Sequence, residues 1–368
     1  MSKSFVVRAA SILVVLAVAG NAWAGPKPQF FGYEEWERAV IERQLDPRDV
    51  VYPFETTPEM IAWAEEKIQP CARNSEILPL TVLQQALFHT SYSFAYDNMR
   101  TLTAADAFAE REGNCMSFTS LFVAVSRSLG YPTFLVSVRR PPGVEKADGV
   151  VVVNHHVVAA FRGPRKVYIF DFSATSEEPY SHKRVIDDLA ASAIFHTNLG
   201  GESIRNGDLD EARRHLEIAT TLAPEWAPAW TNLGVTRFRL GDTDGALEAY
   251  RSALVADPLN PSALTNMSSV YRSLGREKEA QTALRTAAEG TRSPFTLIAM
   301  AEVDMVQGNF ESARRYLRRA RWWYGKEPEV YDALARLALY EQDQARAEKH
   351  SRRAAELRRQ RSEMNDSG

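Results

Sequence analysis

The sequence predicts a two-part protein, with an α+β domain in the N-terminal half and an all-α solenoid of helical repeats in the C-terminal half. In the C-terminal half a short stretch returns every 33 or 34 residues, which is typical of stacked helix pairs. The N-terminal half has no such repeat and passes from helical periodicity to β-branched and aromatic runs separated by turns. The 368 residues, 45% of them hydrophobic, are enough for two cores of full size.

The first 24 residues are typical of an export signal. Lys3 and Arg8 precede the apolar run "AASILVVLAVAG", and "NAWAG" provides an A-x-A cleavage site that ends at Ala24. The apolar run is shorter than the roughly 20 residues that span a bilayer. We therefore expect residues 1–24 to be removed and the mature chain to be exported, to the periplasm if the source is Gram-negative, with no stable membrane span. An uncleaved anchor is the alternative.

The net charge and the cysteines exclude several classes of function. The net charge is −3, or −5 without Lys3 and Arg8, which gives no reason to expect a nucleic-acid partner. Only two cysteines occur, so an oxidising compartment allows one disulfide at most. We expect Cys71 to be a shielded thiol, with a Cys71–Cys115 bridge as the alternative. The sequence has neither an H-E-x-x-H stretch nor a glycine-rich phosphate loop, so we expect no metal and no cofactor.

The C-terminal half repeats a seven-residue stretch that ends in alanine, from "NGDLDEA" to "EQDQARA". The five alanines follow one another at spacings of 34, 34, 33 and 34 residues, which is the tetratricopeptide period. These residues are Ala212, Ala246, Ala280, Ala313 and Ala347. Larger residues recur four positions after the first four of them, and alanines recur seven positions after all five. The segment resembles a solenoid of five tetratricopeptide repeats at 193–361, followed by a tail at 362–368.

The remaining part of the chain divides into a helical or linker segment at 25–54 and a domain at 55–192. Before residue 111 we expect helices, interrupted by "DPRD", "YPFETTP" and "ILPL". Residues 115–129 predict a strong helix with one apolar face, which "GYP" ends. The runs "TFLVSV", "GVVVVNHHVVAAF" and "KVYIFDFSA" then predict strands, with "RRPPGVEKADG" and "RGPR" as breaks. Helices followed by a strand meander make an α+β domain.

Cys115 lies at the start of the predicted helix, directly after "GN". At a helix N-terminus the macrodipole and the free backbone N–H groups favour the thiolate, which is the nucleophilic form of cysteine. The same N–H groups can stabilise an oxyanion on an attacked carbonyl. A cysteine nucleophile also needs a base and a group that orients the base. The histidine pair at 155–156 and Asp171 can supply both, on adjacent antiparallel strands that place His156 beside Asp171.

A cysteine at a helix start, a histidine on one strand and an aspartate on the next resemble the transglutaminase-like superfamily, which has papain-like active-site geometry. "GNCMSFTSLFVAVSRSLGYP" is similar to its cysteine helix, and "NHHVVAAF" and "YIFDFSA" resemble its histidine and aspartate strands. The resemblance implies that Cys115 is the nucleophile, His156 the general base and acid, and Asp171 the group that orients it. From about residue 55 to 361, the chain resembles bacterial exported proteins that join such a domain to tetratricopeptide repeats.

His155 and His156 point to opposite faces of a strand, so the choice between them needs a reason. In the superfamily the base precedes a short apolar strand, as "HVV" does here, and this favours His156. Taken singly, each of the three residues has a simpler interpretation. These are a small core cysteine, a hydrogen-bonded structural histidine and an aspartate that begins a turn. The order of the three residues and their context favour the catalytic interpretation.

The repeats predict a part that binds a protein or peptide. Such solenoids bind peptides in a groove lined by the first helix of each repeat, where Asn198, Asn232 and Asn266 recur at one position. These amides could bind an extended peptide backbone, but asparagine is also common at this position of the repeat. Near the C-terminus, "ARRYLRRARWWYGK" and "SRRAAELRRQR" concentrate arginine. This favours a solvated end cap over a site for an acidic partner.

We therefore expect an exported thiol enzyme that acts on amide bonds and recruits a protein substrate through its repeats. Attack by Cys115 would give a thioester. Water would resolve it as in a protease, amidase or deamidase, and an amine would resolve it as in a cross-linker. The resemblance favours hydrolysis. The alternatives are a non-catalytic scaffold or binding module made of the same two parts, and a purely structural envelope protein.

Overall fold

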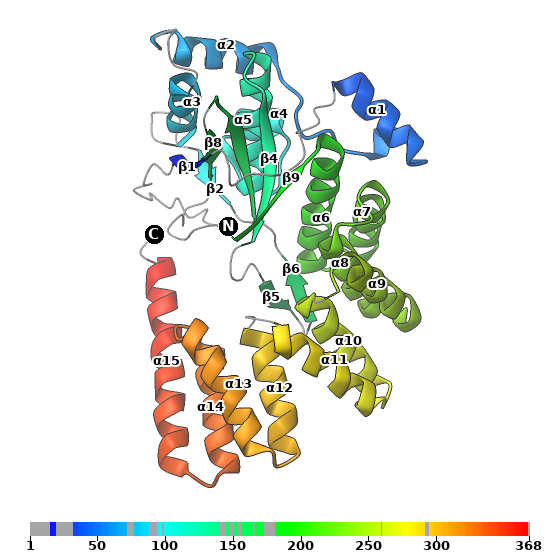
Figure 1. The fold of residues 1–368 in the computed structure, drawn as a ribbon, viewed down its shortest axis with the longest axis vertical. Coiled ribbons are helices and arrows are strands. Elements are labelled where there is room, and N and C mark those ends of the chain that lie inside the picture. Colours follow the sequence, from blue (N-terminus) through cyan, green and yellow to red (C-terminus); the bar gives the residue numbers. More distant parts are fainter. Residues whose placement is uncertain are drawn as a thin grey trace. The chain divides into compact units, whose positions relative to one another are not determined.

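The structure is a computed structural model, and its elements are labelled in Figure 1. It describes residues 15–19, 32–71, 77–88, 94–97, 99–139, 144–147, 150–153, 156–164, 166–172, 181–258, 260–290 and 294–366. The chain divides into two compact units. The first is Met1–Arg140 with His155–Ala229, and the second is Pro141–Asn154 with Trp230–Gly368. The predicted α+β domain followed by helical repeats is confirmed.

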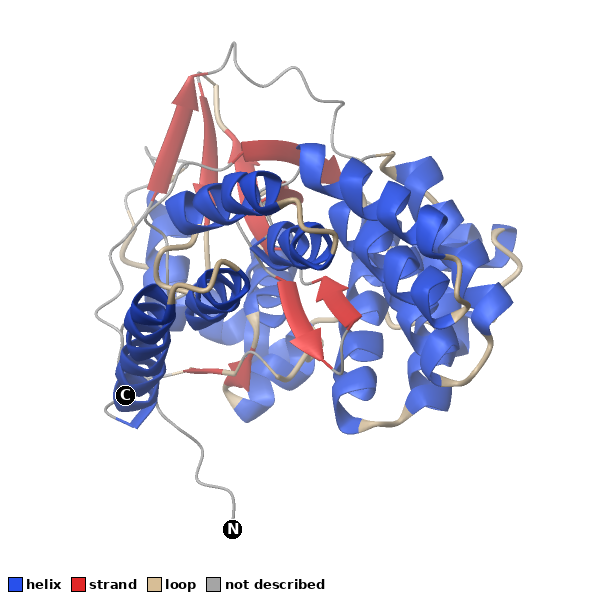
Figure 2. Ribbon diagram, turned by 90° about the horizontal axis from the view of Figure 1, so that it is seen from below, coloured by secondary structure: helices blue, strands red, loops and turns tan. Residues whose placement is uncertain are grey.

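The first unit is built on a five-stranded sheet with the order β1-β8-β7-β4-β9, in which all neighbouring strands are antiparallel. Figure 2 draws the strands of the protein in red. The strands are β1 (Val15–Ala19), β4 (Thr133–Arg139), β7 (His156–Arg162), β8 (Lys166–Phe170) and β9 (Ser181–Ile186). In β7 the residues from Val157 to Phe161 are all buried, so both faces of this strand are covered. This explains why "VVAAF" is a continuous apolar run rather than an alternating one.

Eight helical elements complete the described part of the first unit. They are α1 (Tyr33–Glu42), the 3-10 helix η2 (Pro47–Asp49), α2 (Pro58–Ile68), α3 (Leu78–Phe88), α4 (Ala104–Glu110), α5 (Cys115–Ser128), α6 (Asp188–Asn206) and α7 (Leu209–Leu222). Helix α5 packs against β7 and β4, and every residue from Met116 to Ser126 is buried. The predicted cysteine helix is therefore the central helix of this unit.

The segment at 25–54, predicted to be helical or a linker, is described from residue 32 onwards and packs against α6 and α7. Trp36 donates its indole N–H to Ser192 Oγ at 3.0 Å, and Arg43 donates to the carbonyl of Leu222. Apolar residues from α1, α5, the sheet, α6 and α7 form one continuous core cluster. The helix pair that the sequence assigns to the first repeat thus shares its core with the cysteine helix.

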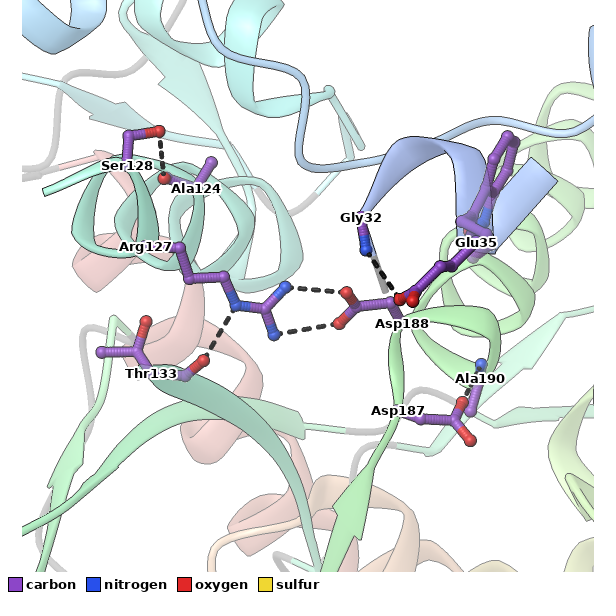
Figure 3. A network of polar contacts seen from close by, with 11 residues as sticks. Gly32, Glu35, Ala124, Arg127, Ser128, Thr133, Asp187, Asp188 and Ala190 are labelled. Atoms are coloured by element: carbon purple, nitrogen blue, oxygen red, sulfur yellow. Dashed lines mark hydrogen bonds and ion pairs between the residues drawn. The ribbon is translucent and has the colours of Figure 1, made fainter. Parts of the chain in front are cut away.

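An ion pair ties the C-terminal end of α5 to the start of α6. Arg127 donates to both carboxylate oxygens of Asp188, at 2.8 and 2.9 Å, and to the carbonyl of Thr133 at 2.9 Å (Figure 3). Asp188 is 0% exposed. A buried carboxylate is tolerated only when its oxygens are paired in this way, and the planar guanidinium provides the matching geometry.

The second unit consists of helix pairs and one β-hairpin. The helices are α8 (Ala227–Arg239, beginning in the first unit), α9 (Thr243–Ala256), α10 (Pro261–Ser273), α11 (Glu277–Gly290), α12 (Pro294–Val306), α13 (Phe310–Trp323), α14 (Pro328–Tyr340) and α15 (Gln344–Asp366). The hairpin joins β5 (Val144–Ala147) to β6 (Val150–Val153), and β6 contacts α10. The structure also describes a short parallel pair in the first unit, β2 (Ala95–Tyr96) with β3 (Glu112–Gly113).

The period of the sequence corresponds to pairs of helices. The five alanines that define it are 0–4% exposed, as expected for residues between closely packed helices. At Gly234 a Cβ atom would lie 2.4 Å from the ring of Tyr250, so only glycine lets α8 and α9 approach this closely. The prediction of helical repeats is confirmed.

Three details of the predicted strands were wrong. The run "GVVVVNHHVVAAF" forms two strands, β6 and β7, in different sheets. The supposed break "RRPPGVEKADG" contains β5, and a further strand, β9, follows the three predicted runs. Periodicity reports which residues are apolar, but it does not report where an apolar run leaves one sheet for another.

Residues 15–19 of the predicted signal form the edge strand β1, paired with β8. The rest of 1–24 lies outside the described residues. Cleavage after Ala24, which stays a prediction, would remove β1 and leave β8 at the edge of the sheet. Within the described ranges, no helix combines the length and the apolar character that a membrane crossing requires.

Candidate functional site

Asn114 caps the helix that begins with Cys115. Its backbone is extended, and its Oδ1 accepts hydrogen bonds from the backbone N–H groups of Met116 and Ser117, at 3.0 and 3.1 Å. An N-cap of this kind contributes about 1 kcal/mol to helix stability. From the sequence, the N–H groups of the first turn are predicted to be free. For these two residues that expectation was wrong, because the cap occupies them.

Gly113 allows the chain to enter the helix at this point. Its φ is +150°, and a Cβ atom there would lie 2.6 Å from Cβ of Ser117. Only glycine avoids both the backbone strain and this clash. Gly113 also pairs with Tyr96 in the parallel ladder of β3 and β2, which brings Tyr96 next to the start of α5.

His156 and Asp171 meet at the end of the sheet. His156 is the first residue of β7, and Asp171 directly follows β8. From the sequence, Asp171 is expected directly opposite His156. The register pairs Ala159 with Phe170, so Asp171 lies diagonally across from His156 instead. His156 Nε2 is nevertheless 2.8 Å from Asp171 Oδ1. The two side chains are only 11% and 2% exposed.

The strand that carries His156 is fixed to the cysteine helix by the next residue, Val157. The backbone N–H of Val157 is hydrogen-bonded to the Cys115 sulfur, and its carbonyl accepts from Thr119 Oγ1 at 3.3 Å. Thr119 lies one turn after Cys115 on α5. These contacts hold the start of α5 against the start of β7, and Cys115 and His156 are hydrogen-bonded to each other. Since Nε2 faces Asp171, Nδ1 is the ring nitrogen left for the thiol.

The pKa of the Cys115 thiol is lowered, and the pKa of His156 is raised. Burial raises the pKa of the Cys115 thiol, but the hydrogen bond and charge of His156 and the Val157 N–H outweigh burial, so the pKa is lowered overall. Burial lowers the pKa of His156, but hydrogen bonds to Asp171 and Cys115 raise it to about 9. Together these shifts favour the thiolate–imidazolium form of the pair.

Tyr96 is a member of this site that sequence reasoning missed. Its hydroxyl is hydrogen-bonded to the Cys115 side chain and to the Cys115 backbone N–H. Burial, together with the negative charges of Cys115 and Asp171, raises the pKa of Tyr96 well above its ordinary value. Tyr96 therefore remains a neutral donor, beside the N–H that an oxyanion would use.

Gln84 on α3 is a second residue that was missed. Its Nε2 donates to the backbone carbonyl of Asp171 at 3.1 Å, and the side chain is 6% exposed. Its Oε1 is buried without a hydrogen-bond partner among the described residues. Gln84 thus holds the backbone of Asp171 in place, whereas its position in an apolar helix gives no sign of this in the sequence.

The other residues singled out in the sequence are placed as follows. His155 lies outside the described residues. Cys71 and Cys115 are both half-buried free thiols, so the alternative of a bridge between them is not formed. The described residues contain no group of three or more His, Cys, Asp or Glu side chains that could hold a metal ion.

The three asparagines of the repeats do not share one environment. Asn198 lies on α6 in the first unit and is half-buried. Asn232 and Asn266 lie in the second unit, are 1% and 0% exposed, and have partners within the protein. Neither of these two amides presents an open surface to a peptide.

Family models match two parts of the chain. The Transglutaminase-like superfamily matches residues 79–170, a segment that contains Cys115 and His156 and ends one residue before Asp171. Two models of the tetratricopeptide repeat match residues 200–261 and 261–289. The chain therefore joins a transglutaminase-like segment to tetratricopeptide repeats. No curated protein matches the chain.

Solved structures similar to this chain are tetratricopeptide repeat proteins. PilF of Pseudomonas aeruginosa is 23% identical, with a TM-score of 0.40, over 45% of this chain and 76% of that one. PilW, described as a type IV pilus biogenesis factor, is 21% identical, with a TM-score of 0.39, over 45% and 77%. MamA is 18% identical, with a TM-score of 0.37, over 45% and 97%.

Proposed function

We propose that this chain, which joins a transglutaminase-like segment to tetratricopeptide repeats, is a thiol-dependent acyl-transfer enzyme acting on amide bonds of a protein or peptide. Cys115 is the nucleophile, His156 the general base and acid, and Asp171 the group that orients the histidine. The observation that carries the proposal is the contact series from the Cys115 thiol through the His156 ring to Asp171 Oδ1, with 2.8 Å at the second step.

The reaction begins with the thiolate. Cys115 attacks the amide carbonyl, and the developing oxyanion accepts hydrogen bonds from the Cys115 N–H and the Tyr96 hydroxyl, which release each other to receive it. The imidazolium of His156 gives its proton to the leaving amine, and a thioester with Cys115 remains. His156, now neutral, takes a proton from water as the water attacks the thioester. The bond to sulfur then breaks, the acid product leaves, and the thiolate–imidazolium pair is restored.

An amine in place of water would give transamidation by the same steps. We place hydrolysis first because of the resemblance to cysteine hydrolases of the superfamily. The repeats are proposed to recruit the substrate, since repeats of this kind generally mediate contacts between proteins. Because Asn232 and Asn266 are buried, this recruitment does not depend on an exposed asparagine row. We propose export of the mature chain as well, which N-terminal sequencing of the secreted or periplasmic fraction would test by a start at Gly25.

The decisive experiment is alkylation of the purified protein with iodoacetamide over a range of pH, followed by mass spectrometry of both cysteine peptides. An ordinary thiol has a pKa of about 8.5 and is therefore about 0.3% ionised at pH 6. We expect Cys115 to react at pH 6 at least about tenfold faster than Cys71, and Cys71→Ser to leave the Cys115 rate unchanged. Equal rates for both cysteines, with an ordinary titration, would favour the alternative of a non-catalytic binding module.

A further inference from the structure

We infer that Glu202, on the first helix of the repeat part, is a positioning residue for Cys115, because it completes a hydrogen-bond chain that runs through Thr101 to the Asn114 cap. This inference rests on the proposed function, since it concerns the reactivity of the Cys115 thiolate. Glu202 lies 87 positions after Cys115 in the sequence, in the stretch "GGESIRN" of the first repeat.

The N-terminus of α5 sets the donor-to-acceptor direction of the hydrogen-bond chain. The backbone N–H groups of Met116 and Ser117 can only donate, so the Asn114 atom that faces them must be the oxygen, Oδ1. The Nδ2 group of Asn114 then faces Thr101 Oγ1, at 2.7 Å, and donates to it. Thr101 therefore accepts this hydrogen bond and must place its own proton elsewhere.

Glu202 accepts the hydrogen bond that this proton makes. Its Oε1 accepts the hydroxyl of Thr101, which completes the chain from carboxylate to helix cap. Thr101 and Asn114 are 5% and 7% exposed, so water has little access to replace the acceptor. Without an acceptor for its own proton, the Thr101 hydroxyl holds Nδ2 of Asn114 less firmly, because hydrogen bonds in a chain strengthen one another, and the cap over the first turn of α5 loosens.

A further contact makes the first turn of α5 depend on the position of the Asn114 side chain. The Ser117 hydroxyl also donates to Asn114 Oδ1, at 3.2 Å, and accepts the Leu102 backbone N–H at 2.7 Å. Oδ1 of Asn114 thus already accepts from three donors of the first turn. An Asn114 side chain that is held less firmly at Nδ2 would weaken all three hydrogen bonds and loosen the turn that holds the sulfur of Cys115.

The same helix holds the other end of α5 through the Arg127–Asp188 ion pair. Asn114 and Arg127 are 13 positions apart and Asp188 and Glu202 are 14 apart, so at about 1.5 Å per residue both pairs span about 20 Å. One helix of the repeat part therefore carries polar contacts to both ends of the cysteine helix. Glu202 acts at the reactive end.

The test compares two substitutions of equal size in the full chain. Glu202→Gln keeps an oxygen that can accept from Thr101, whereas Glu202→Met fills the same space without one. We expect Glu202→Met to lower the Cys115 alkylation rate at pH 6 about fivefold, which is the size of a lost N-cap, and to move the pH profile upwards. Glu202→Gln should retain the wild-type profile. Glu217→Met, at an exposed position on α7, is the matched control and should change nothing.

Thr101→Val should reproduce the effect of Glu202→Met, Thr101→Ser should not, and the double variant should lose no more than either single variant. This threonine pair carries the test where Glu202→Met does not fold. A wild-type profile in Glu202→Met and Thr101→Val, or an equal loss in Gln and Met at position 202, would overturn the inference. An ordinary titration of Cys115 in the wild type would instead overturn the proposed function.

Discussion

His156 and His196 are two largely buried histidines of the same unit whose pKa values move in opposite directions. The pKa of His156 is raised to about 9, and that of His196 is lowered to about 3. Burial lowers both values, so burial does not separate them. At His156 the hydrogen bonds to Asp171 and Cys115 overcome burial. At His196 the neighbouring His215 and Arg214 add to burial, and Glu211 opposes it only in part.

The hydrogen bonds of His196 explain why this ring is neutral. Its Nε2 accepts the backbone N–H of Val51 at 3.0 Å, so its proton must be on Nδ1, which faces Nδ1 of His215 at 2.9 Å. His215 then accepts through Nδ1 and donates from Nε2 to Glu211, at 3.1 Å. This series joins the segment before residue 55 to α6 and α7, and an added proton would break it. Direct contact with a carboxylate and a thiol therefore distinguishes the reactive histidine, His156, from the structural one.

The largest expected difference between the two histidines lies in the reactivity of Cys115. His156→Ala should lower the rate of iodoacetamide labelling of Cys115 at pH 6 about 100-fold, because an uncharged neighbour returns the thiol towards its ordinary pKa. His196→Gln should leave this rate unchanged. The rate is measured by mass spectrometry of the Cys115 peptide. A similar loss in both variants would contradict the claim that His156, and not His196, activates Cys115.

The second difference concerns the pH dependence of stability. His196 is neutral in the folded state, whereas in the unfolded state it takes up a proton near pH 6.5. Its contribution to stability is therefore complete above pH 6.5 and falls as the pH drops towards 3, by about 2 kcal/mol between pH 7 and pH 5. Urea unfolding at both pH values should show this loss in the wild type and a smaller one in His196→Gln.

The sign is opposite for His156, whose contribution is complete below pH 6.5 and is lost as the pH rises to about 9. In His156→Ala the change in stability between pH 7 and pH 9 should therefore be smaller than in the wild type. Identical pH dependence in the wild type and both variants would contradict the assigned protonation states.

Asp171→Asn should have an intermediate effect. The amide no longer stabilises the imidazolium, so the pKa of His156 should fall below about 9 in an NMR titration, and labelling of Cys115 at pH 6 should slow about tenfold. The matched control is Asp187→Asn, at the cap of α6, where Oδ1 accepts from the Ala190 N–H at 2.7 Å (Figure 3). This variant should label at the wild-type rate.

The smallest effect is expected for Tyr96→Phe. Removing one neutral hydrogen bond to the thiolate should slow labelling of Cys115 about threefold, in line with the lower part of the range of roughly 0.5–1.5 kcal/mol for a typical hydrogen bond. A faster rate would show instead that the hydroxyl shields the sulfur more than it stabilises the thiolate.

The sequence predicts those parts of the molecule whose signal is local or periodic. The repeat period predicts the helix pairs, and the order of Cys115, His156 and Asp171 with their flanking runs predicts the residues that the structure brings together. Tyr96 and Glu202 escaped prediction because a two-residue parallel ladder and a distant helix bring them to Cys115, and neither leaves a periodic trace. The lowered pKa of His196 comes first from burial and then from His215, 19 residues away, and neither cause has a sequence signal of its own.

The core that α1, the cysteine helix and the first helix pair have in common has a consequence for how such a chain can evolve. Recombination preserves folding when its breakpoints cross few contacts. A breakpoint at residue 192 would divide a cluster in which Trp36, Ala193 and Phe195 are all buried. Lineages that shuffle their repeats should therefore inherit the first pair together with the cysteine, and gain, lose or exchange only the repeats that follow.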